Sequence, residues 1–507
     1  MYVCKKNIDK KNNINYEHEY EIRKKKLNKI KKNGFNFPNN FKPNINISSI
    51  NKKYSNKTNT QLTKINITVQ IAGRIMKQRI MGKASFITIQ DMQGEIQIYI
   101  SEKKISFNFY HQQFKKWDIG DIISVYGKIF KTKTGQLSIY CYKTNLLSKS
   151  IQPFPDKFHG LINKEIRYRK RYLDLLFNKN TINNFIKRSN ILMIIREFMN
   201  KNQFLEVETP MLQSIPGGAK AEPFITHHKT LNITMYLRIA PELYLKKLII
   251  GGFEKIYEIN RNFRNEGISF KHNPEFTMME LYMVYSDYHD LMEFIKHLLK
   301  YIVYKIHGVY TIEYQNHPLQ FCKPFQKFTI IEAILHYNKY IKKEDLQNIK
   351  KIKKIAHLNN ITIKKSWSIE KIITKIFTTT TENKLIQPTF ITEYPIEVSP
   401  LSKRNNTQNN LADRFEFFMG GMEIANGFSE LNDYQDQKER FLQQALKEKN
   451  RNDKKNFYDQ EYITALEYGM PPTAGLGIGI DRLVMILTNQ TNIRDIILFP
   501  TLKPNNK

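Results

Sequence analysis

The sequence is poor in cysteine and has no long hydrophobic run. Its 507 residues include only 3 cysteines, Cys4, Cys141 and Cys322, which stand far apart and without metal-ligand spacing. This excludes a disulfide framework and a zinc site, and a reducing compartment is expected. No stretch approaches the roughly 18 apolar residues that cross a bilayer, so we expect no membrane partner. The N-terminus has neither an apolar signal region nor the composition of a transit peptide, and cytoplasm is the expected location.

Positive charge, in contrast, is abundant. Lys and Arg number 80 against 47 Asp and Glu, which gives a formal net charge of +33. Such a charge suits a polyanionic partner, because Lys and Arg that neutralise phosphates release condensed counterions. A codon bias towards Lys, Asn and Ile would produce the same excess without any binding role, so both explanations stay open. The densest basic block, residues 21–32, is expected to be helical.

The length of the chain exceeds what one hydrophobic core usually organises, so several folded units are expected. Changes in periodicity give the boundaries. We predict a basic helical extension and linker at residues 1–64, a β-rich domain at 65–150, a linker at 151–178, and a larger mixed domain at 179–507. The larger domain is expected to contain a helical insertion at about 323–387.

The β-rich domain shows strict alternation of apolar and polar residues. Ile65, Ile67, Val69 and Ile71 are predicted to share one face of a first strand. Further strands are predicted at residues 84–91, 96–100, 121–131 and 136–147, with a helix at 107–117 between the third and the fourth. Five short strands with this helix are typical of an OB-fold, a barrel that binds single-stranded nucleic acid.

The larger domain opens with a helical period at residues 180–202, followed by FLEVETPML at 204–212. A second segment reads FRNEGISFKHNPEFTMMELY, residues 263–282. Its second half alternates, so one strand face carries Phe276, Met278, Glu280 and Tyr282.

Two further segments carry groups suited to chemistry. AGLGIGIDRLVMI, residues 474–486, places closely spaced glycines before Arg482. These glycines are not the dinucleotide fingerprint, and a packing turn explains them about as well as a ligand does. RFEFFMGGMEIANGFSELND, residues 414–433, contains Glu416 and Glu423, which offer the hard oxygen ligands that Mg²⁺ takes beside nucleotide phosphates.

These segments together resemble the signature motifs of class II aminoacyl-tRNA synthetases, and among these the bacterial-type lysyl-tRNA synthetases are the most similar. The resemblance extends over nearly the whole chain. It implies an α+β fold with an N-terminal OB-fold that reads the anticodon and a catalytic domain built on an antiparallel sheet flanked by helices. It also implies ATP-dependent activation of L-lysine, transfer to tRNA(Lys), Mg²⁺ as cofactor, and a homodimer with Pro210 at its interface.

The resemblance carries over residue by residue. Arg264 and Arg482 would be catalytic, and Glu416 and Glu423 would bind the metal. The residues implied for ATP are Arg264, Glu266, His272, Asn273, Phe276, Glu416, Glu423 and Arg482. The residues implied for lysine are Gly218, Glu242, Glu280, Tyr282, Asn426, Phe428 and Glu430.

The acidic residues in the lysine set also make physical sense, because a buried ammonium needs carboxylate partners. Glu280, Glu430 and Tyr282 are expected to bind the ε-ammonium. Glu242 and the backbone at Gly218 are expected to bind the α-amino group. In the barrel, Arg79, Phe86 and Gln97 are implied for the anticodon. Three positions depart from the family pattern, namely Glu222, Met422 and Ala425.

Three other interpretations compete with this one. A synthetase-like enzyme that attaches lysine to a protein would lack the anticodon-binding barrel. A non-catalytic nucleic-acid-binding protein would not need Arg264, Glu416, Glu423 and Arg482. Aspartate- or asparagine-specific relatives share the architecture but not the acidic pocket.

Overall fold

The computed structural model describes residues 2–155, 163–364, 367–449 and 458–504. The chain divides into two compact units, Met1–Gly160 and Leu161–Lys507. Part of the predicted linker, residues 156–162, and two residues of the predicted insertion, 365–366, lie outside the described residues.

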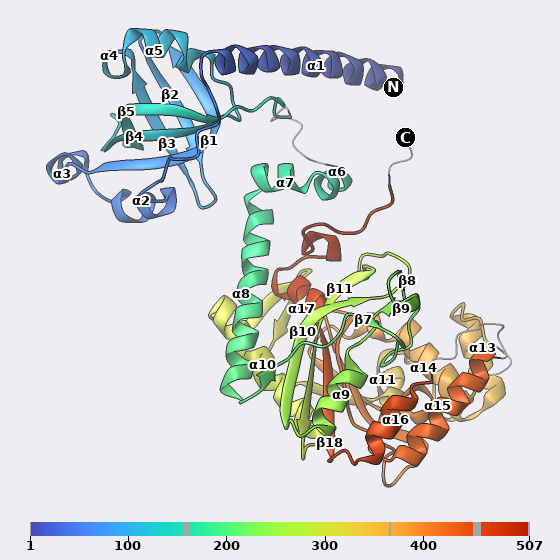
Figure 1. Ribbon diagram of the computed structural model, residues 1–507. Helices are drawn as coiled ribbons and strands as arrows, with labels where there is room; N and C mark the ends of the chain where they lie inside the picture. The colour runs from blue at the N-terminus through green and yellow to red at the C-terminus, as the bar shows by residue number, and fades with distance from the viewer. Residues whose placement is uncertain (1, 156–162, 365–366, 450–457, 505–507) are drawn as a thin grey trace. The chain divides into compact units, whose positions relative to one another are not determined.

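The first unit contains a closed five-stranded barrel, as predicted, with strand order β1-β2-β3-β5-β4 (Figure 1). Alternating residues of each strand fill its interior, because neighbouring side chains of a strand point to opposite faces. The strands are β1 (Thr68–Met81), β2 (Ala84–Gln90), β3 (Glu95–Ser101), β4 (Ile122–Lys131) and β5 (Leu137–Ser148). Between β3 and β4 lie α4 (Glu102–Ile105), α5 (Phe107–Gln112) and η1 (Phe114–Lys116), where one helix was predicted.

The prediction for Ile65 is wrong, because this residue ends a helix and does not begin the first strand. Helix α3 (Asn59–Ile65) starts at a capping box of Thr58 and Gln61 and stops at Asn66, whose φ is 51°. Such local start and stop signals outweigh the alternation that continues through Ile65. Leu62 of α3, together with Ile47 and Ile50 of α2 (Ile47–Tyr54), is buried with the barrel core.

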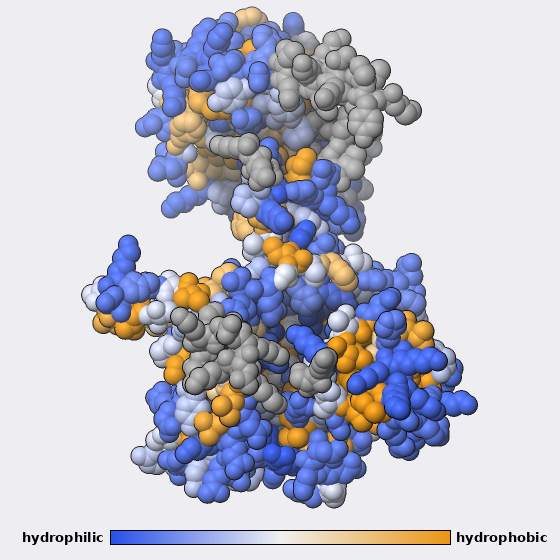
Figure 2. Space-filling view, turned by 90° about the vertical axis from the view of Figure 1, so that its right-hand side faces the viewer, coloured by the Kyte–Doolittle hydropathy of each residue, from blue (hydrophilic) through white to orange (hydrophobic). Residues whose placement is uncertain are grey.

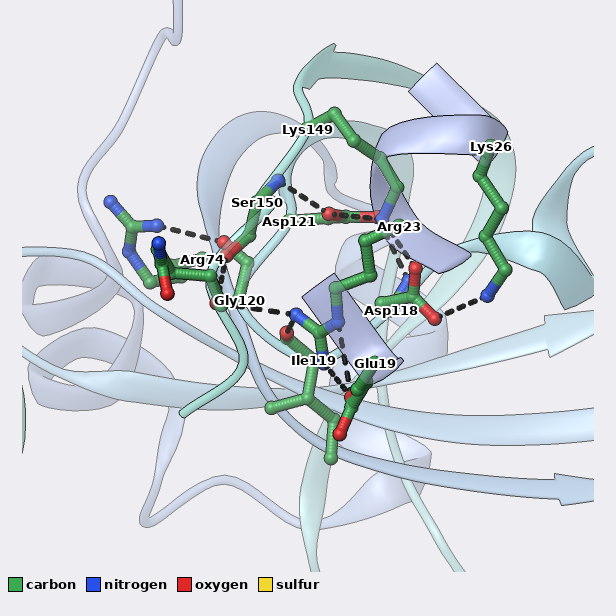
Figure 3. A network of polar contacts seen from close by, with 11 residues as sticks. Glu19, Arg23, Lys26, Arg74, Asp118, Ile119, Gly120, Asp121, Lys149 and Ser150 are labelled. Atoms are coloured by element: carbon green, nitrogen blue, oxygen red, sulfur yellow. Dashed lines mark hydrogen bonds and ion pairs between the residues drawn. The ribbon is translucent and has the colours of Figure 1, made fainter. Parts of the chain in front are cut away.

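The basic helix α1 (Tyr2–Lys32) lies against the barrel, as Figure 3 shows. Lys26 Nζ is 2.6 Å from Asp118 Oδ1, and the buried Lys149 Nζ is 2.9 Å from Asp121 Oδ1. Arg23 donates to the carbonyl oxygen of Ile119 at 3.0 Å. The predicted basic helix thus contacts the barrel through one ion pair, from Lys26, and through the hydrogen bond of Arg23.

The second unit is built on an eight-stranded sheet with order β14-β15-β16-β17-β18-β11-β10-β6. The predicted antiparallel sheet is present, and only its two edge pairs, β14-β15 and β10-β6, are parallel. The bounds are β6 (Leu205–Glu206), β10 (Lys255–Phe263), β11 (Glu275–Val284), β14 (Gln326–Thr329), β15 (Thr389–Pro395), β16 (Leu411–Met419), β17 (Met422–Ser429) and β18 (Thr473–Gly479).

Helices cover one face of this sheet and enclose the main core. They are α8 (Lys179–Lys201), α10 (Tyr288–His307) and α17 (Ile480–Leu487). Met279 and Leu281 of β11, and Leu476 and Ile478 of β18, point into that core. The other face of the sheet carries α9 (Glu242–Ile250), which contacts β10, β11 and α16 (Gln460–Glu467), and α16 contacts α15 (Tyr434–Lys449).

Smaller elements complete the unit. The predicted insertion contains α11 (Ile330–Tyr337), α12 (Lys343–Gln347), α13 (Ile349–Leu358), α14 (Ile369–Thr380) and η2 (Glu382–Lys384), which share a core of their own. It also contains edge strand β14, which was not predicted. The remaining elements are α6 (Lys164–Arg169), α7 (Arg171–Phe177), β7 (Leu212–Gln213), β8 (Ile225–His228), β9 (Ile233–Leu237), β12 (Thr311–Tyr314), β13 (His317–Gln320), η3 (Ile396–Val398) and η4 (Ile493–Asp495).

The face of the molecule in Figure 2 is mostly hydrophilic, with hydrophobic patches on both units. Around motif residues 204–212, several large apolar side chains are exposed, including Leu205, Met211 and Leu212. Among the described residues, no helix combines the length and the apolar character needed to span a bilayer.

Candidate active site and nucleic-acid interface

A cavity of about 1100 Å³ lies in the second unit, on the face of the sheet that carries α9. The alternate residues of β11 that were predicted to share a face, Phe276, Met278, Glu280 and Tyr282, all line it. Strands β17 and β18 contribute Asn426, Phe428 and the glycines opposite them. The sheet therefore brings residues from distant parts of the sequence to one cavity.

The inner end of this cavity is acidic. Glu242 and Glu280 line it and are buried beside Tyr282, and the buried Glu430 lies next to them but is not itself among the described lining residues. The Tyr282 hydroxyl donates to Glu280 Oε2 at 3.3 Å. Burial raises the pKa of Glu280 to about 8, and the charge of Glu242 adds to the shift. Burial also raises the pKa of Glu430 well above its usual value, although the positive charge of Lys246 opposes this.

Gly475 makes room for these side chains. On β18 it lies opposite Tyr282 of β11 and Phe428 of β17. A Cβ atom at this position would lie 2.1 Å from Glu430 Oε1 and 2.6 Å from the Tyr282 ring. Gly218 has a φ of 82° and approaches Glu242 in the same way, with 2.8 Å between an added Cβ and the Glu242 Cβ. Close approach to the acidic side chains, and not only packing, thus explains why glycine stands here.

The two sequence-predicted arginines also line the cavity. The guanidinium of Arg264 is 5.1 Å from the centre of the Phe276 ring. Its Nε is buried and has no hydrogen-bond partner among the described residues. Arg482 donates from Nη1 to the carbonyl oxygen of Glu423 at 2.8 Å, and its Nη2 is 3.0 Å from His272 Nε2. Burial, followed by the charge of Arg482, lowers the pKa of His272, which favours the neutral ring.

Two other predicted nucleotide residues lie on the same loop. Glu266 lines the cavity and is exposed. Asn273 also lines the cavity, but its amide donates to the carbonyl oxygen of Glu275 at 2.6 Å, and its Oδ1 accepts from the Thr501 backbone at 3.2 Å. In this structure Asn273 therefore ties the loop to the C-terminal segment.

The two carboxylates expected to hold a metal come from neighbouring strands. Glu423 lines the cavity, and Glu416 is held by Arg414 Nη2 at 2.6 Å and by the Tyr394 hydroxyl at 2.8 Å. Burial raises the pKa of Glu416 to about 7, despite Arg414, and the charge of Glu423 contributes to the rise. Crowded carboxylates of this kind suit a divalent cation, because its charge would favour their ionised forms.

A bulge in β17 places Glu423 on the cavity side. Phe417 lies opposite Ala425, but Phe418 lies opposite Glu423, so Ile424 is the extra residue. Ile424 and Ala425 both enter the core, whereas Asn426 and Glu423 line the cavity. Strict alternation from Asn426 would have sent Glu423 to the core face. Of the positions that depart from the family pattern, Met422 is buried in the core and Ala425 is buried at the cavity wall.

Sequence reasoning missed several residues that support the site. Lys246 pairs with Glu242 at 2.7 Å, and its spacing of four residues on a helix is a signal that could have revealed it. Arg188 of α8 pairs with Asp481 at 2.7 Å, and Asp481 Oδ2 accepts from the Thr277 backbone at 2.8 Å. This contact fixes the start of α17, and with it Arg482, against β11.

The residues expected at the anticodon lie on the outside of the barrel. Arg79 of β1 is paired with Phe86 of β2, and Phe86 with Tyr99 of β3, while Gln97 is two residues from Tyr99 and so shares its face. Phe86 is half-buried, whereas its neighbour Ile87 fills the core. The Ser138 hydroxyl donates to Gln97 Oε1 at 2.9 Å.

Phe86 belongs to a row of aromatic side chains on this outer face. Its ring centre is 5.0 Å from that of Tyr99, which in turn is 5.3 Å from that of Tyr140. Phe130 and Tyr142 continue the row at 6.0 and 5.8 Å from Tyr140. Half-buried rings on an outer face offer stacking surfaces to unpaired bases.

Comparison with known proteins agrees with this geometry. Residues 163–503 match the family model described as tRNA synthetases class II (D, K and N), and residues 69–147 match the OB-fold nucleic acid binding domain. A lysine–tRNA ligase of Buchnera aphidicola subsp. Schizaphis graminum is 59% identical and covers 99% of this chain and 100% of the relative. The heat-inducible lysine–tRNA ligase of Escherichia coli K12 is 53% identical, with 97% of both chains covered.

The chain belongs to the class II tRNA synthetases, as its sheet, its cavity and the family model agree. It is thus a ligase of the aminoacyl-tRNA synthetase type. Within that class it belongs to the family of lysine–tRNA ligases, whose members match it over nearly its whole length.

Proposed function

We propose that the chain activates L-lysine with ATP and transfers the lysyl group to the 3′ end of tRNA(Lys). The observation that carries this proposal is the acidic inner end of the cavity, where Glu242, Glu280 and Glu430 are buried together. A buried carboxylate is costly unless a cation meets it, and L-lysine brings two ammonium groups. A cavity for aspartate or asparagine would not need this charge.

Activation joins two anions, the lysine carboxylate and the α-phosphate of ATP. The site must therefore neutralise charge and align the attack. Arg264 lines the same cavity as Glu280 and Glu423, whose charges both act on it, and its buried Nε, which has no hydrogen-bond partner among the described residues, supports a role in binding the lysine carboxylate and the α-phosphate. We assign Arg482, His272, Asn273, Glu266 and Phe276 to the rest of the nucleotide.

Within the lysine site, Glu280, Glu430 and Tyr282 would bind the ε-ammonium. Glu242 and the backbone at Gly218 would bind the α-ammonium. Asn426 and Phe428, which line the cavity between the acidic end and Glu423, would flank the substrate. No protein nucleophile is required, since the lysine carboxylate attacks the α-phosphate of ATP and displaces pyrophosphate, and the terminal ribose hydroxyl of the tRNA then attacks the carbonyl of the adenylate and displaces AMP.

Mg²⁺ would be held by Glu416 and Glu423, which supply the hard oxygen ligands it prefers. When bound, it would offset the negative charge of the phosphates. The raised pKa of Glu416, which burial and the nearby Glu423 produce, supports a cation at this place.

The barrel would read the anticodon through Arg79, Phe86 and Gln97. Their common outer face and the aromatic row around Phe86 support this role. We further propose a cytoplasmic homodimer that uses Pro210, because Leu205, Met211 and Leu212 leave apolar surface exposed beside it.

Two measurements test the proposed activity. ATP–pyrophosphate exchange is measured with lysine, aspartate and asparagine in turn, and only lysine is expected to support it. Aminoacylation of tRNA(Lys) is then measured with the native anticodon and with a changed one. Exchange that depends on aspartate would contradict the lysine pocket, and lysylation of a protein without charging of tRNA would favour the protein-modifying alternative.

A further inference from the structure

Lys246 is a buried cation behind the acidic end of the cavity, and the proposed reaction gives it no role. Its side chain is 0% exposed, and its Nζ lies 2.7 Å from Glu242 Oε1. The same Nζ also pairs with Glu430. Lys246 is not among the described residues that line the cavity, whereas Glu242 is. Glu430 is not among them either, so Lys246 reaches Glu242, the one of the two carboxylates that lines the cavity, from the protein side.

The surroundings of Lys246 hold its ammonium in place. Glu242 and Lys246 stand four residues apart on α9, the spacing at which side chains of a helix meet. The Phe428 ring, which lines the cavity, lies 5.5 Å from Nζ. The buried Tyr462 of α16 lies close enough to Lys246, Glu430 and Glu242 for their charges to act on its pKa. Three different segments of the chain thus converge on one buried ammonium.

The acidic end has more buried carboxylates than resident cations. Three buried carboxylates, Glu242, Glu280 and Glu430, form the acidic end. Among the described residues, Lys246 is the only Lys or Arg that forms an ion pair with any of them. Arg238, which also faces Glu280, pairs at 2.7 Å with Glu258. By ion pairs, the acidic end thus has one resident cation for three carboxylates, and Arg264 adds a second positive charge that acts on Glu280.

Position matters as much as charge. Glu430 Oε1 and Oε2 accept no hydrogen bond of good geometry from the described residues, so the contact with Lys246 is what orients this carboxylate. Without that ammonium, Glu242 and Glu430 would repel each other across a buried space. They would turn apart or take up a proton, and a protonated carboxyl no longer complements an ammonium.

We propose that Lys246 is a positioning residue for amino-acid selection: it bridges Glu242 and Glu430 and holds both carboxylates in the orientation that meets the ammonium groups of L-lysine. The inference rests on the proposed function, because it assumes that the pocket binds lysine. It adds a residue that does not touch the substrate but decides how the carboxylates meet it.

The test uses Lys246→Ala in the full-length enzyme, with Lys247→Ala as the matched control. Lys247 is the next residue of α9 but lies at the surface, where it pairs with the exposed Glu461. In ATP–pyrophosphate exchange, K246A is expected to raise the KM for lysine by roughly 10- to 100-fold, the range for partners that orient ligand groups from behind. The KM for ATP and the exchange rate at saturating lysine should stay near wild type, and K247A should change neither.

Chemical rescue separates charge from packing. K246A leaves space beside the two carboxylates, so methylammonium chloride is expected to lower the KM for lysine back towards wild type, whereas sodium chloride at the same ionic strength should not. Lys246→Met fills the space without charge, and it should show the raised KM without rescue. K246M also carries the test if K246A does not fold, as judged by its thermal unfolding.

Two results would overturn the inference. One is a wild-type KM for lysine in K246M, because the ammonium would then be dispensable. The other is a raised KM in K246A that methylammonium does not lower, or lowers no more than sodium chloride does, because the ammonium would then not be what orients the carboxylates. Failure of the proposed function is distinct, because the wild-type enzyme itself would then show no lysine-dependent exchange.

Discussion

The barrel and the catalytic cavity recognise their ligands by different physical means. On the barrel, Arg79 is exposed and Phe86 is half-buried on the outer face, over a core of isoleucines. In the cavity, Glu242, Glu280 and Glu430 are buried, and burial raises the pKa of Glu280 to about 8. Stacking of bases tolerates water, whereas selection of an ammonium by carboxylates is strong only where water is excluded. We therefore expect substitutions in the cavity to reduce activity more than substitutions on the barrel.

The largest effect is expected from Glu430→Gln. The ε-ammonium would lose a charged partner, and Lys246 would lose one of its two. Truncating one partner of a buried pair costs about 2–5 kcal/mol, so lysine-dependent pyrophosphate exchange should nearly vanish while ATP binding and the fold remain. The exposed Glu461→Gln serves as control. Unchanged exchange in the Glu430 variant would place the ammonium elsewhere.

Arg264→Ala should reduce adenylate formation by about 10² to 10³, because the guanidinium would meet charge that develops at the α-phosphate. Lysine binding, measured by calorimetry, should weaken far less. Arg261→Ala, which removes a half-exposed arginine at 3.7 Å from Glu275, is the matched control. Near-normal activation by the Arg264 variant would remove this residue from the mechanism.

On the barrel, Phe86→Ala combined with Gln97→Ala should impair charging of tRNA(Lys) but leave lysine-dependent exchange intact. Stacking on an aromatic ring is worth about 1–3 kcal/mol per base, and a lost hydrogen bond to a base adds to it. Phe107→Ala removes an exposed ring on α5 of the same unit and should have no such effect. If the double variant charges tRNA normally, the barrel does not read the anticodon by these residues.

A smaller effect is expected from pH on lysine binding. With a pKa of about 8, the buried Glu280 carboxyl holds its proton below that pH, and an ammonium requires the ionised form. Lysine should therefore release a proton on binding, and its affinity should rise with pH by up to about tenfold per unit below pH 8. Calorimetry in two buffers of different ionisation enthalpy measures this proton. Affinity that is flat between pH 6.5 and 8 would contradict it.

The smallest effect concerns the contact of α1 with the barrel. Lys26→Ala removes the ion pair with Asp118, whose partly exposed position makes it worth about 0.2–1 kcal/mol. Hydrogen exchange of the backbone amides in α1 should become faster. Lys24→Ala, which breaks a 3.8 Å contact with Glu21 on the exposed side, should leave that rate unchanged. Equal exchange in both variants would show that α1 is held by apolar contacts instead.

Local patterns predicted much of this molecule. Alternation along β11 placed Glu280 and Tyr282 on the face that the structure shows at the cavity, because a strand has a period of two. The same rule predicted the barrel strands, and it failed at Ile65, where a helix stop signal was the stronger determinant. It also missed β14, a short edge strand of only 4 residues in which Gln326 and Lys327 are polar.

The sequence by itself determined the fold class, the family and the charged residues of the motifs, since these depend on periodicity and on motifs that are continuous along the chain, but it did not reveal Lys246 or Arg188. Only the tertiary structure decided how the charges meet. The bulge at Ile424 turns Glu423 towards the cavity, and the approach of β17 to α9 brings Glu430 onto Lys246. Residues 246 and 430 are far apart in sequence, and the energy of a buried charge depends on which groups surround it in space.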